Sequence, residues 1–347
     1  MKALRWYAPY DVRVEDVEEP KIINETDAIV RVSLAGICGT DLHVYRGHFQ
    51  IIPGNIIGHE FIGYVENVGK GVKRFSKGDR VVVSCWIVDG SCWYCMHGFY
   101  TQCEKINIFG LGPLYGEEIS GAHAELVRVP NADVMLFKIP EEIKEEKILT
   151  LSDGLPAAYA GLIEGGFRPG YSVAVLGFGP IGAMAAICAR AIGAGEIVTV
   201  DVDENRLNFA RDLGFKTVNA RSTDVAEEVR NLTEGRGADL VIEAVGGSIE
   251  TIDKAIEIAR RKGTVSVVGL HAQEYNKFPA GQLWITEKRL VFVIGDTIKY
   301  RNELFELIKN NRIDVSKIIT HKFSLDEAPQ GYEMFDKRKT FKAVIKP

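Results

Sequence analysis

The sequence lacks any uninterrupted apolar run of about 18 residues, the length that a membrane-spanning helix requires. Its N-terminal segment, MKALRWYAPYDVRVEDVEEP, also lacks an apolar core of signal-peptide length. Basic residues are not in excess, because 42 Lys and Arg against 47 Asp and Glu give a net charge of -5. This balance gives no electrostatic support for binding nucleic acid or an anionic membrane. We therefore expect a globular protein of the cytoplasm with neither kind of partner.

Cysteine is also scarce, with 6 in 347 residues, and four of the six are clustered at Cys85, Cys92, Cys95 and Cys103. In the reducing cytoplasm, clustered cysteines are better interpreted as metal ligands than as disulfides. Four thiolates would suit a tetrahedral zinc ion. The interval between Cys85 and Cys92 is long, however, and Asp89 lies within it. Which four groups hold the metal is open on this evidence alone.

The texture of the chain changes near residue 155. Before it, short β-like runs such as AIVRVSLAGI and DRVVVSC are punctuated by glycine, which predicts a compact antiparallel β domain. After it, buried strands alternate with helices, for example ADLVIEAVG followed by the predicted helix SIETIDKAIEIARRKG. This alternation predicts a parallel, doubly wound sheet. The C-terminal helix and strand are too short for a third domain, so we expect an α/β chain with one domain at 1–154 plus 294–347 and another at 155–293.

The sequence GFGPIG supplies Gly177, Gly179 and Gly182 in the G-x-G-x-x-G pattern, between a predicted strand and a predicted helix. Glycines allow the tight turn and the close approach of a pyrophosphate to the helix N-terminus. Asp201 ends the next strand, where a carboxylate can accept both ribose hydroxyls and repel a 2'-phosphate, so NAD is favoured. The simpler alternative makes Asp201 a helix N-terminal acid. Arg206 keeps NADP open, since its charge could attract a 2'-phosphate.

The segments AGICGTDLHVYRG and GNIIGHEFIGYVENVGKGVKRFSKGDRV carry a further pattern. Both resemble segments of the zinc-containing alcohol dehydrogenases of the medium-chain dehydrogenase/reductase family. The resemblance covers essentially the whole chain, including the glycine fingerprint and the domain order. It implies a GroES-like catalytic domain with a zinc lobe near 85–115, an NAD-binding Rossmann domain, and assembly as a homodimer or homotetramer.

The resemblance places a catalytic zinc at Cys38, His59 and Asp153, as in the branches of the family whose third ligand is Asp. Glu60 of the G-H-E motif is implied to enter the coordination shell during ligand exchange. Three protein ligands and one open position suit a catalytic zinc, which lowers the pKa of a bound alcohol oxygen. Singly, Cys38 could be a small buried hydrophobe and Asp153 a helix cap. With His59 in the same order, a metal site is the better interpretation.

The family also implies roles for residues outside the metal ligands. Thr40 and His43 occupy the positions that pass the alcohol proton outward, although His43 could be an ordinary half-buried histidine. The backbone of Val268 is expected to contact the nicotinamide amide, and the neighbouring His271 is left open. Lys342 occupies the position of a cation against the pyrophosphate, with solvent exposure as its alternative.

A second, structural zinc follows from the register of the family's lobe, whose pattern is C-G-x-C-x-x-C, seven residues, then C. Its first ligand falls ten residues after the Asp of G-D-[RK]-V, and counting from Asp79 reaches Asp89 rather than a cysteine. The predicted ligands are therefore Asp89, Cys92, Cys95 and Cys103. In the rival assignment Cys85 replaces Asp89. A site with three sulfurs and one oxygen is acceptable to zinc but weaker than four sulfurs.

Taken together, these features predict a zinc-dependent, NAD-linked dehydrogenase that oxidises a small alcohol or polyol, or reduces the matching carbonyl. Sugar, threonine and formaldehyde dehydrogenases of the same family are alternatives for the substrate. A non-catalytic nucleotide-binding protein of the same fold is the alternative from another class. An open metal position argues against it, because a binding module has no use for one.

Overall fold

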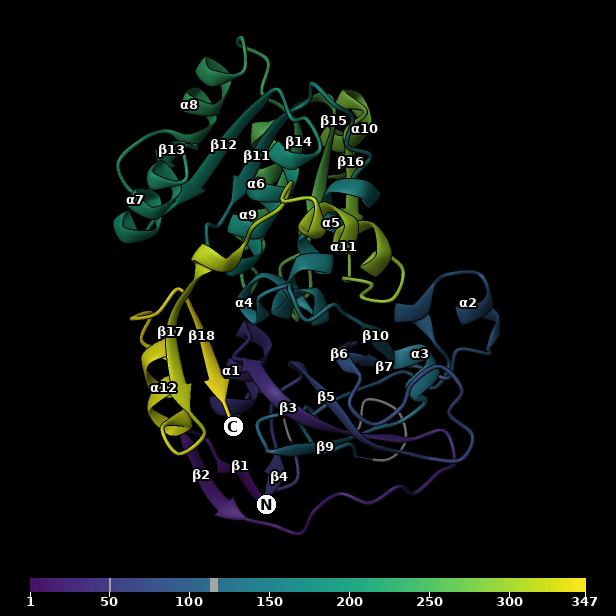
Figure 1. Cartoon of the computed structure of the whole chain (residues 1–347). Helices are drawn as coiled ribbons and strands as arrows, with labels where there is room; N and C mark the ends of the chain where they lie inside the picture. The colour runs from purple at the N-terminus through teal and green to yellow at the C-terminus, as the bar shows by residue number, and fades with distance from the viewer. Residues whose placement is uncertain (50, 113–117) are drawn as a thin grey trace. The chain divides into compact units, whose positions relative to one another are not determined.

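The computed structural model describes residues 1–49, 51–112 and 118–347. The chain divides into two compact units, which we call unit 1 (Met1–Pro156 with Asp296–Pro347) and unit 2 (Ala157–Gly295) (Figure 1). The boundaries differ by two residues from the expected 154 and 294. Residues 113–115 of the predicted zinc lobe lie outside the described part. None of the helices in the described part has the length and apolar character to span a bilayer.

Unit 1 is built on a seven-stranded sheet of order β10-β6-β5-β3-β18-β17, with β9 also paired to β3. Its strands are β3 (Ala28–Gly36), β5 (Glu60–Val68), β6 (Arg80–Val83), β9 (Leu126–Val129), β10 (Leu136–Lys138), β17 (Ile319–Ser324) and β18 (Lys342–Lys346). The pairings are antiparallel except for the parallel pair β17 and β18. The C-terminal strand therefore completes the sheet that the N-terminal part begins.

Smaller elements surround this sheet. A three-stranded sheet joins β1 (Lys2–Ala8), β2 (Asp11–Asp16) and β4 (Asn55–Ile56), and a two-stranded one joins β7 (Trp86–Ile87) and β8 (Asn107–Ile108). The helices are α1 (Gly39–Tyr45), α2 (Trp93–Met96), α3 (Ala132–Met135), α4 (Glu145–Ile148), α11 (Arg301–Lys309) and α12 (Ala328–Asp336), with 3-10 turns at Tyr100–Gln102, Leu149–Ser152 and Ser316–Ile318.

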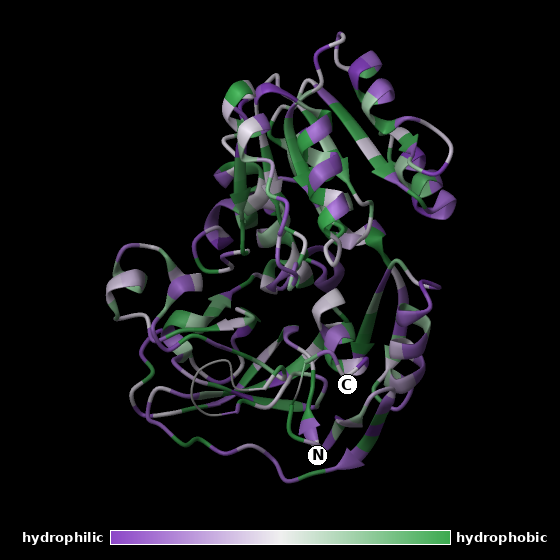
Figure 2. Cartoon of the chain, turned by 180° about the vertical axis from the view of Figure 1, so that it is seen from behind, coloured by the Kyte–Doolittle hydropathy of each residue, from purple (hydrophilic) through white to green (hydrophobic). Residues whose placement is uncertain are grey.

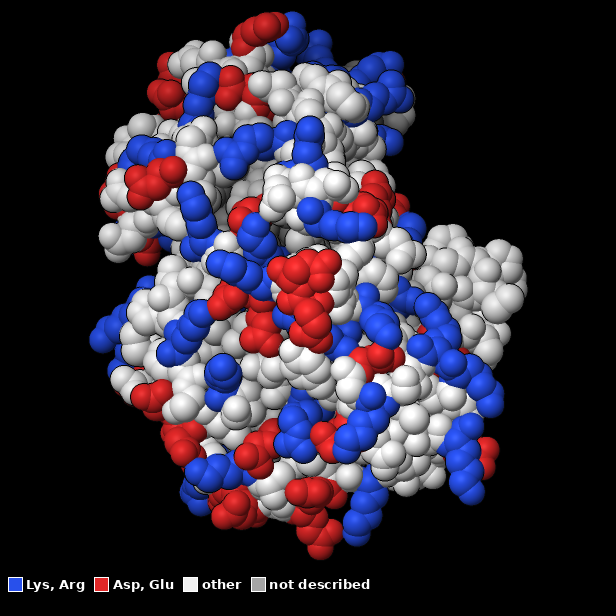
Figure 3. All heavy atoms as spheres, viewed as in Figure 1, with Lys and Arg blue, Asp and Glu red and all other residues white. Residues whose placement is uncertain are grey.

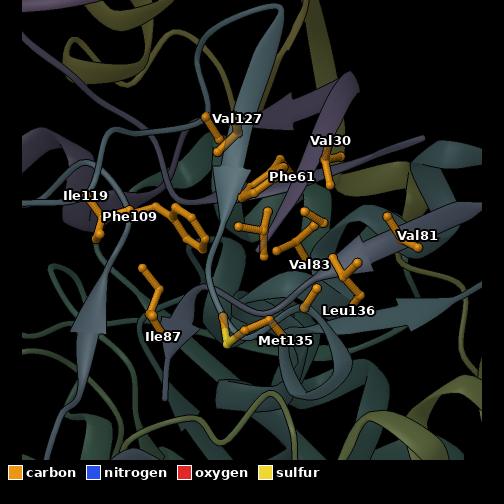
Figure 4. Close-up of a cluster of buried hydrophobic side chains, with 14 of the residues drawn as sticks. Val30, Phe61, Val81, Val83, Ile87, Phe109, Ile119, Val127, Met135 and Leu136 are labelled. Carbon is orange, nitrogen blue, oxygen red and sulfur yellow. The ribbon is translucent and has the colours of Figure 1, made fainter. Parts of the chain in front are cut away.

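The core of unit 1 is a cluster of apolar side chains from β3, β5, β6 and their neighbours (Figure 4). Alternate residues of β3, such as Val30 and Val32, are buried, while Arg31 between them is exposed. Phe61 and Phe109 meet edge to face at 5.2 Å between ring centroids, a favoured aromatic geometry. This packing holds the ends of β3 and β5 rigidly in place.

Unit 2 is a six-stranded parallel sheet of order β13-β12-β11-β14-β15-β16. Its strands are β11 (Ser172–Leu176), β12 (Glu196–Asp201), β13 (Lys216–Asn219), β14 (Ala238–Glu243), β15 (Ala259–Val267) and β16 (Arg289–Phe292). The helices are α5 (Gly154–Glu164, which begins in unit 1), α6 (Pro180–Ala191), α7 (Glu204–Asp212), α8 (Val225–Leu232), α9 (Ile249–Ile258) and α10 (Ala280–Thr286). The strand order is that of a doubly wound dinucleotide-binding sheet, in which the order of successive strands reverses between β11 and β14.

Hydropathy follows this layering. Strands of the parallel sheet are coloured hydrophobic, while hydrophilic turns lie on the helices (Figure 2).

One expectation is wrong: the predicted helix at residues 248–263 ends at Ile258, and β15 begins at Ala259. The cause is tertiary, because Ala259 pairs with Ala238 at a register shift in the parallel ladder. Charges of both signs are interspersed over the face in Figure 3, as a mildly acidic chain without a basic field predicts.

Candidate metal centres and nucleotide site

Three candidate metal ligands in unit 1 meet because of a strand register. Gly36 pairs with Glu60 in the antiparallel ladder of β3 and β5, so Cys38 and His59 leave the same end of neighbouring strands. Asp153 joins them from the turn that precedes α5. Its Oδ2 atom lies 3.2 Å from Sγ of Cys38 and 3.3 Å from Nε2 of His59. The donor atoms of all three residues lie within 4.8 Å of one another.

A fully buried carboxylate, Asp41, orients two of these ligands. Its Oδ1 is 2.9 Å from Nδ1 of His59, and its Oδ2 accepts the backbone N–H of Cys38 at 2.8 Å. Nε2 of His59 therefore faces Asp153. Such outer hydrogen bonds fix the tautomer and the ring orientation of a metal-binding histidine. Sequence analysis missed Asp41, although its place three residues after Cys38, in the first turn of α1, was a signal.

The protonation of this cluster fits a cation. Burial acts to lower the pKa of His59, but Asp41 and Asp153 raise it well above its ordinary value. Burial acts to raise the pKa of Asp153, but the hydrogen bond and charge of His59 lower it overall. Burial and the charge of Asp153 raise the pKa of the Cys38 thiol. The raised pKa values mean that Cys38 and His59 hold protons in this state. A divalent metal would displace these protons and be surrounded by a thiolate, a neutral imidazole and a carboxylate. Chemically the donor set suits zinc.

Glu60 and Lys342 form a buried ion pair beside the cluster. Both are at least 98% buried, with exposed fractions of 0% and 2%, and Oε2 of Glu60 contacts Nζ of Lys342. The exposed alternative for Lys342 is therefore wrong, because the carboxylate neutralises its charge inside the protein. The other oxygen, Oε1 of Glu60, is buried without a hydrogen-bond partner in the described part of the chain. Burial raises the pKa of Glu60 against the opposing effect of Lys342.

Cys85 lies beside the same cluster rather than in the zinc lobe. Its Sγ is 3.4 Å from Oδ1 of Asp153, and its backbone N–H donates to the carbonyl of Ser152 at 3.0 Å. The thiol is fully buried, and burial raises its pKa well above the ordinary value. The rival assignment of Cys85 to the lobe is wrong, because the end of β6 directs it to Asp153.

The lobe around α2 brings together the four donors that the register predicts. These are Asp89, Cys92, Cys95 and Cys103, whose ligand atoms lie within 4.8 Å of one another. Oδ1 of Asp89 also accepts the backbone N–H groups of Ser91 and Cys92, so the carboxylate shapes its own turn. Sγ of Cys103 accepts the N–H groups of Asp89 and Lys105 at 3.3 and 3.4 Å. Burial raises the pKa of the Cys103 thiol, and these amide donors act in the opposite direction by favouring the thiolate.

The two proposed relay residues, Thr40 and His43, contact different neighbours. The hydroxyl of Thr40 is 3.8 Å from Sγ of Cys38. His43 instead has its Nδ1 at 3.2 Å from Nδ1 of His48 and stacks on Phe49. Among the described residues, no hydrogen bond joins Thr40 to His43. His48 is therefore the direct neighbour of His43.

The glycine fingerprint forms the turn between β11 and α6 in unit 2. Gly177 has a φ of +90°, in the left-handed region that favours glycine. Gly179 caps α6, and a Cβ on Gly182 would lie 1.9 Å from the carbonyl oxygen of Gly177. Gly177 is therefore required by the turn and Gly182 by the close packing of helix on strand, whereas a Cβ on Gly179 would meet nothing nearer than Nη1 of Arg206 at 3.7 Å. Val268 follows β15 and donates its N–H to the carbonyl of Glu243 at 2.9 Å.

Asp201 ends β12 beside this turn, and its oxygens accept the N–H groups of Phe178 and Val202, both at 2.7 Å. The helix N-cap next to it is Asp203, which accepts from residues of α7, so the simple capping interpretation of Asp201 is wrong. Nη1 of Arg206 is 3.6 Å from Oδ2 of Asp201. The arginine charge is thus directed at Asp201.

Metal analysis tests the assignment of the lobe. We expect about two zinc ions per wild-type chain, about one in Asp89→Ala, and about two in the matched control Cys85→Ala. The reason is that Asp89 alone completes four donors with the lobe thiolates. Inductively coupled plasma mass spectrometry on gel-filtered protein measures the ratio. Loss of an ion in Cys85→Ala with none lost in Asp89→Ala contradicts the assignment.

Comparison with known proteins agrees with this geometry. Residues 24–141 match the family model of the alcohol dehydrogenase GroES-like domain, and residues 180–310 match that of zinc-binding dehydrogenase. An alcohol dehydrogenase of Cupriavidus necator is 30% identical, over 100% of this chain and 99% of that protein.

Solved structures are similar over the whole chain. Alcohol dehydrogenase TADH from Thermus sp. ATN1 has a TM-score of 0.95 at 38% identity, covering 100% of this chain and 99% of that one. A zinc-binding dehydrogenase from Sinorhizobium meliloti 1021, bound to NADP, has a TM-score of 0.89 at 27% identity, covering 100% and 99%. The inferred resemblance is confirmed, as is the fold of a GroES-like domain with a Rossmann domain. The chain belongs to the zinc-type alcohol dehydrogenases of the medium-chain dehydrogenase/reductase family.

Proposed function

We propose that the protein is a zinc-dependent, NAD(H)-linked dehydrogenase that oxidises a small alcohol or polyol to its aldehyde or ketone, and catalyses the reverse. The observation that carries the proposal is the convergence of Cys38, His59 and Asp153, whose donor atoms lie within 4.8 Å. Three protein ligands leave a tetrahedral metal one position for substrate. A purely nucleotide-binding protein would have no use for that position. Assembly as a homodimer or homotetramer stays a prediction.

The chain's own residues have distinct parts in this proposal. Cys38, His59 and Asp153 would hold zinc, which supplies a Lewis acid that lowers the pKa of an alcohol. Asp41 keeps Nε2 of His59 directed at the site. The hydroxyl of Thr40, near Cys38, is placed to accept the alcohol proton. The buried, unpartnered Oε1 of Glu60 is suited to act as a temporary ligand during exchange.

Unit 2 would hold the dinucleotide. Gly177, Gly179 and Gly182 open the helix end that receives the pyrophosphate. Asp201 offers a carboxylate to the adenosine ribose, and the backbone of Val268 is the proposed contact of the nicotinamide amide. Arg206 and Lys342 are the proposed cationic contacts of the cofactor, although Lys342 also neutralises Glu60. The nicotinamide ring supplies the hydride acceptor.

The proposed reaction is tested by NADH formation at 340 nm across a panel of alcohols and polyols. We expect turnover that a chelator removes, and a loss of about 100-fold or more in kcat/KM for Asp153→Asn, because an amide is a poor zinc ligand. Asp16→Asn, at an exposed position of β2, is the matched control and should keep full activity. Activity that survives both chelation and Asp153→Asn would contradict the metal assignment, and no turnover in the wild type on any substrate would favour a binding protein.

The coenzyme proposal is tested by Asp201→Asn. The amide keeps an acceptor for the N–H of Phe178 but removes the charge that repels a 2'-phosphate and that faces Arg206. We expect the ratio of kcat/KM for NAD to that for NADP to fall about tenfold or more. Steady-state kinetics with both coenzymes measure it. A wild-type enzyme that uses NADP faster than NAD at equal concentrations would refute this role of Asp201.

The relay is tested by the pH profile of His43→Ala. Burial, and then the neighbouring His48, lowers the pKa of His43, so its imidazole is neutral near pH 7 and able to accept a proton. We expect kcat to fall by about 10- to 100-fold near pH 7, and by much less at high pH, where hydroxide removes the proton directly. His321→Ala, on β17, serves as the control. An unchanged profile removes His43 from the mechanism.

A further inference from the structure

A buried carboxylate joins two loops at the carboxyl ends of β14 and β15. Oε1 of the fully buried Glu243 accepts the N–H groups of Val245 and Gly246, both at 3.0 Å, and the hydroxyl of Thr251 at 2.8 Å. Its backbone carbonyl accepts the N–H groups of Val268 and Gly269. One residue therefore shapes loop 244–247 after its own strand and the start of loop 268–271 after the next.

His271 completes this arrangement and leaves one nitrogen unused. Its Nε2 lies 3.0 Å from Oε2 of Glu243. Because a carboxylate oxygen accepts, Nε2 carries the hydrogen, and in this tautomer Nδ1 is an acceptor. The side chain is 5% exposed, and Nδ1 is buried without a partner in the described part of the chain. Nearly all buried polar groups in native proteins are satisfied, so this nitrogen calls for a donor from outside the chain.

The two loops are in close contact, which leaves little freedom for His271. The N–H of Gly247 donates to the carbonyl of Leu270 at 2.8 Å. A Cβ on Gly269 would lie 2.4 Å from the backbone nitrogen of Gly246 and 2.6 Å from Oε2 of Glu243. The position of the imidazole is thus set by the backbone on both sides.

The place of these loops in the sheet indicates the ligand. A doubly wound sheet of this order binds a dinucleotide outside the carboxyl ends of its strands, with one mononucleotide on each half. The fingerprint after β11 and Asp201 after β12 belong to the half that takes the adenosine and pyrophosphate. The loops after β14 and β15 belong to the other half, which takes the nicotinamide riboside.

We propose that His271 is a binding residue for the nicotinamide riboside half of the cofactor, held by Glu243 through Nε2 and accepting a hydrogen bond at Nδ1. The donor is either the carboxamide N–H or a ribose O–H, which share this chemistry. The proposal rests on dinucleotide binding as proposed above. It assigns His271 and Glu243 to recognition of one half of the molecule only.

Binding to the full-length protein separates the two halves. NADH is measured by fluorescence and ADP-ribose, which lacks nicotinamide, by calorimetry. We expect His271→Phe to weaken NADH binding about tenfold and to leave the dissociation constant of ADP-ribose unchanged. His321→Phe, on β17, should change neither. Unchanged NADH binding in His271→Phe, or an equal loss for both ligands, overturns the proposal.

A second variant reverses the tautomer without removing the ring. In Glu243→Gln, the amide oxygen must remain with the three donors to Oε1, so the NH2 group faces His271. It then donates to Nε2, which moves the ring hydrogen to Nδ1 and converts the acceptor into a donor. We expect a selective loss of NADH affinity like that of His271→Phe, and a changed tautomer by 15N NMR. A changed tautomer with unaltered NADH affinity overturns the proposal.

The source of the donor is resolved by nicotinic acid adenine dinucleotide, which has no carboxamide N–H. If the carboxamide is the donor, His271→Phe leaves the dissociation constant of this analogue unchanged. If a ribose hydroxyl is the donor, the loss of about tenfold persists. If the wild type binds neither NADH nor ADP-ribose, dinucleotide binding itself is refuted. The selective outcomes above concern His271 alone.

Discussion

The antiparallel register of β3 against β5 is the constraint on which the candidate metal centre depends. Pairing of Gly36 with Glu60 fixes where the two strands end, and Cys38 and His59 extend from those ends. A slip of one residue would turn every side chain of a strand to the opposite face. The buried valines of β3 and the aromatic pair of Phe61 and Phe109 make such a slip costly. The core thus positions Cys38 and His59, whereas Asp153 comes from the turn that precedes α5.

The same logic holds in unit 2, where strand order does the positioning. The order of successive strands reverses between β11 and β14, and sheets of this type bind ligands at that point, outside the carboxyl ends of the strands. Asp201 and Glu243, at the ends of β12 and β14, are both buried and both accept backbone N–H groups of the loops that follow their strands. Each carboxylate thus shapes the loop beside it.

The parts of the molecule that sequence predicts well are those encoded locally. Alternating strands and helices and the glycine turn follow from short patterns and their order, and the family resemblance implies the candidate ligands Cys38, His59 and Asp153. Contacts that depend on the folded sheet were not predictable in this way. Lys342 meets Glu60 because β18 joins the sheet next to β3, and Cys85 reaches Asp153 because of where β6 ends. No spacing along the chain encodes either contact.

The same reason explains the error at Ala259 and why the role of His271 was left open. The helical pattern of the sequence continues into Arg260 and Arg261, but these residues belong to β15 because that strand pairs with β14. The bond between His271 and Glu243 joins residues of two successive strand ends, which only the parallel ladder brings together. Asp41 was also missed, but for a different reason, because its place three residues after Cys38 was visible in the sequence.

Unit 1 is assembled from two stretches of chain separated by the whole of unit 2, and β18 lies inside its sheet, between β3 and β17. During synthesis, Ala35 and Gly36 at the end of β3 must therefore lack their β18 partner until all of unit 2 and the last strands have been made. Only then does the ammonium group of Lys342 arrive to balance the interior carboxylate of Glu60. The order of synthesis thus delays completion of the candidate metal centre until the last strand is made, whereas unit 2 is free to form earlier.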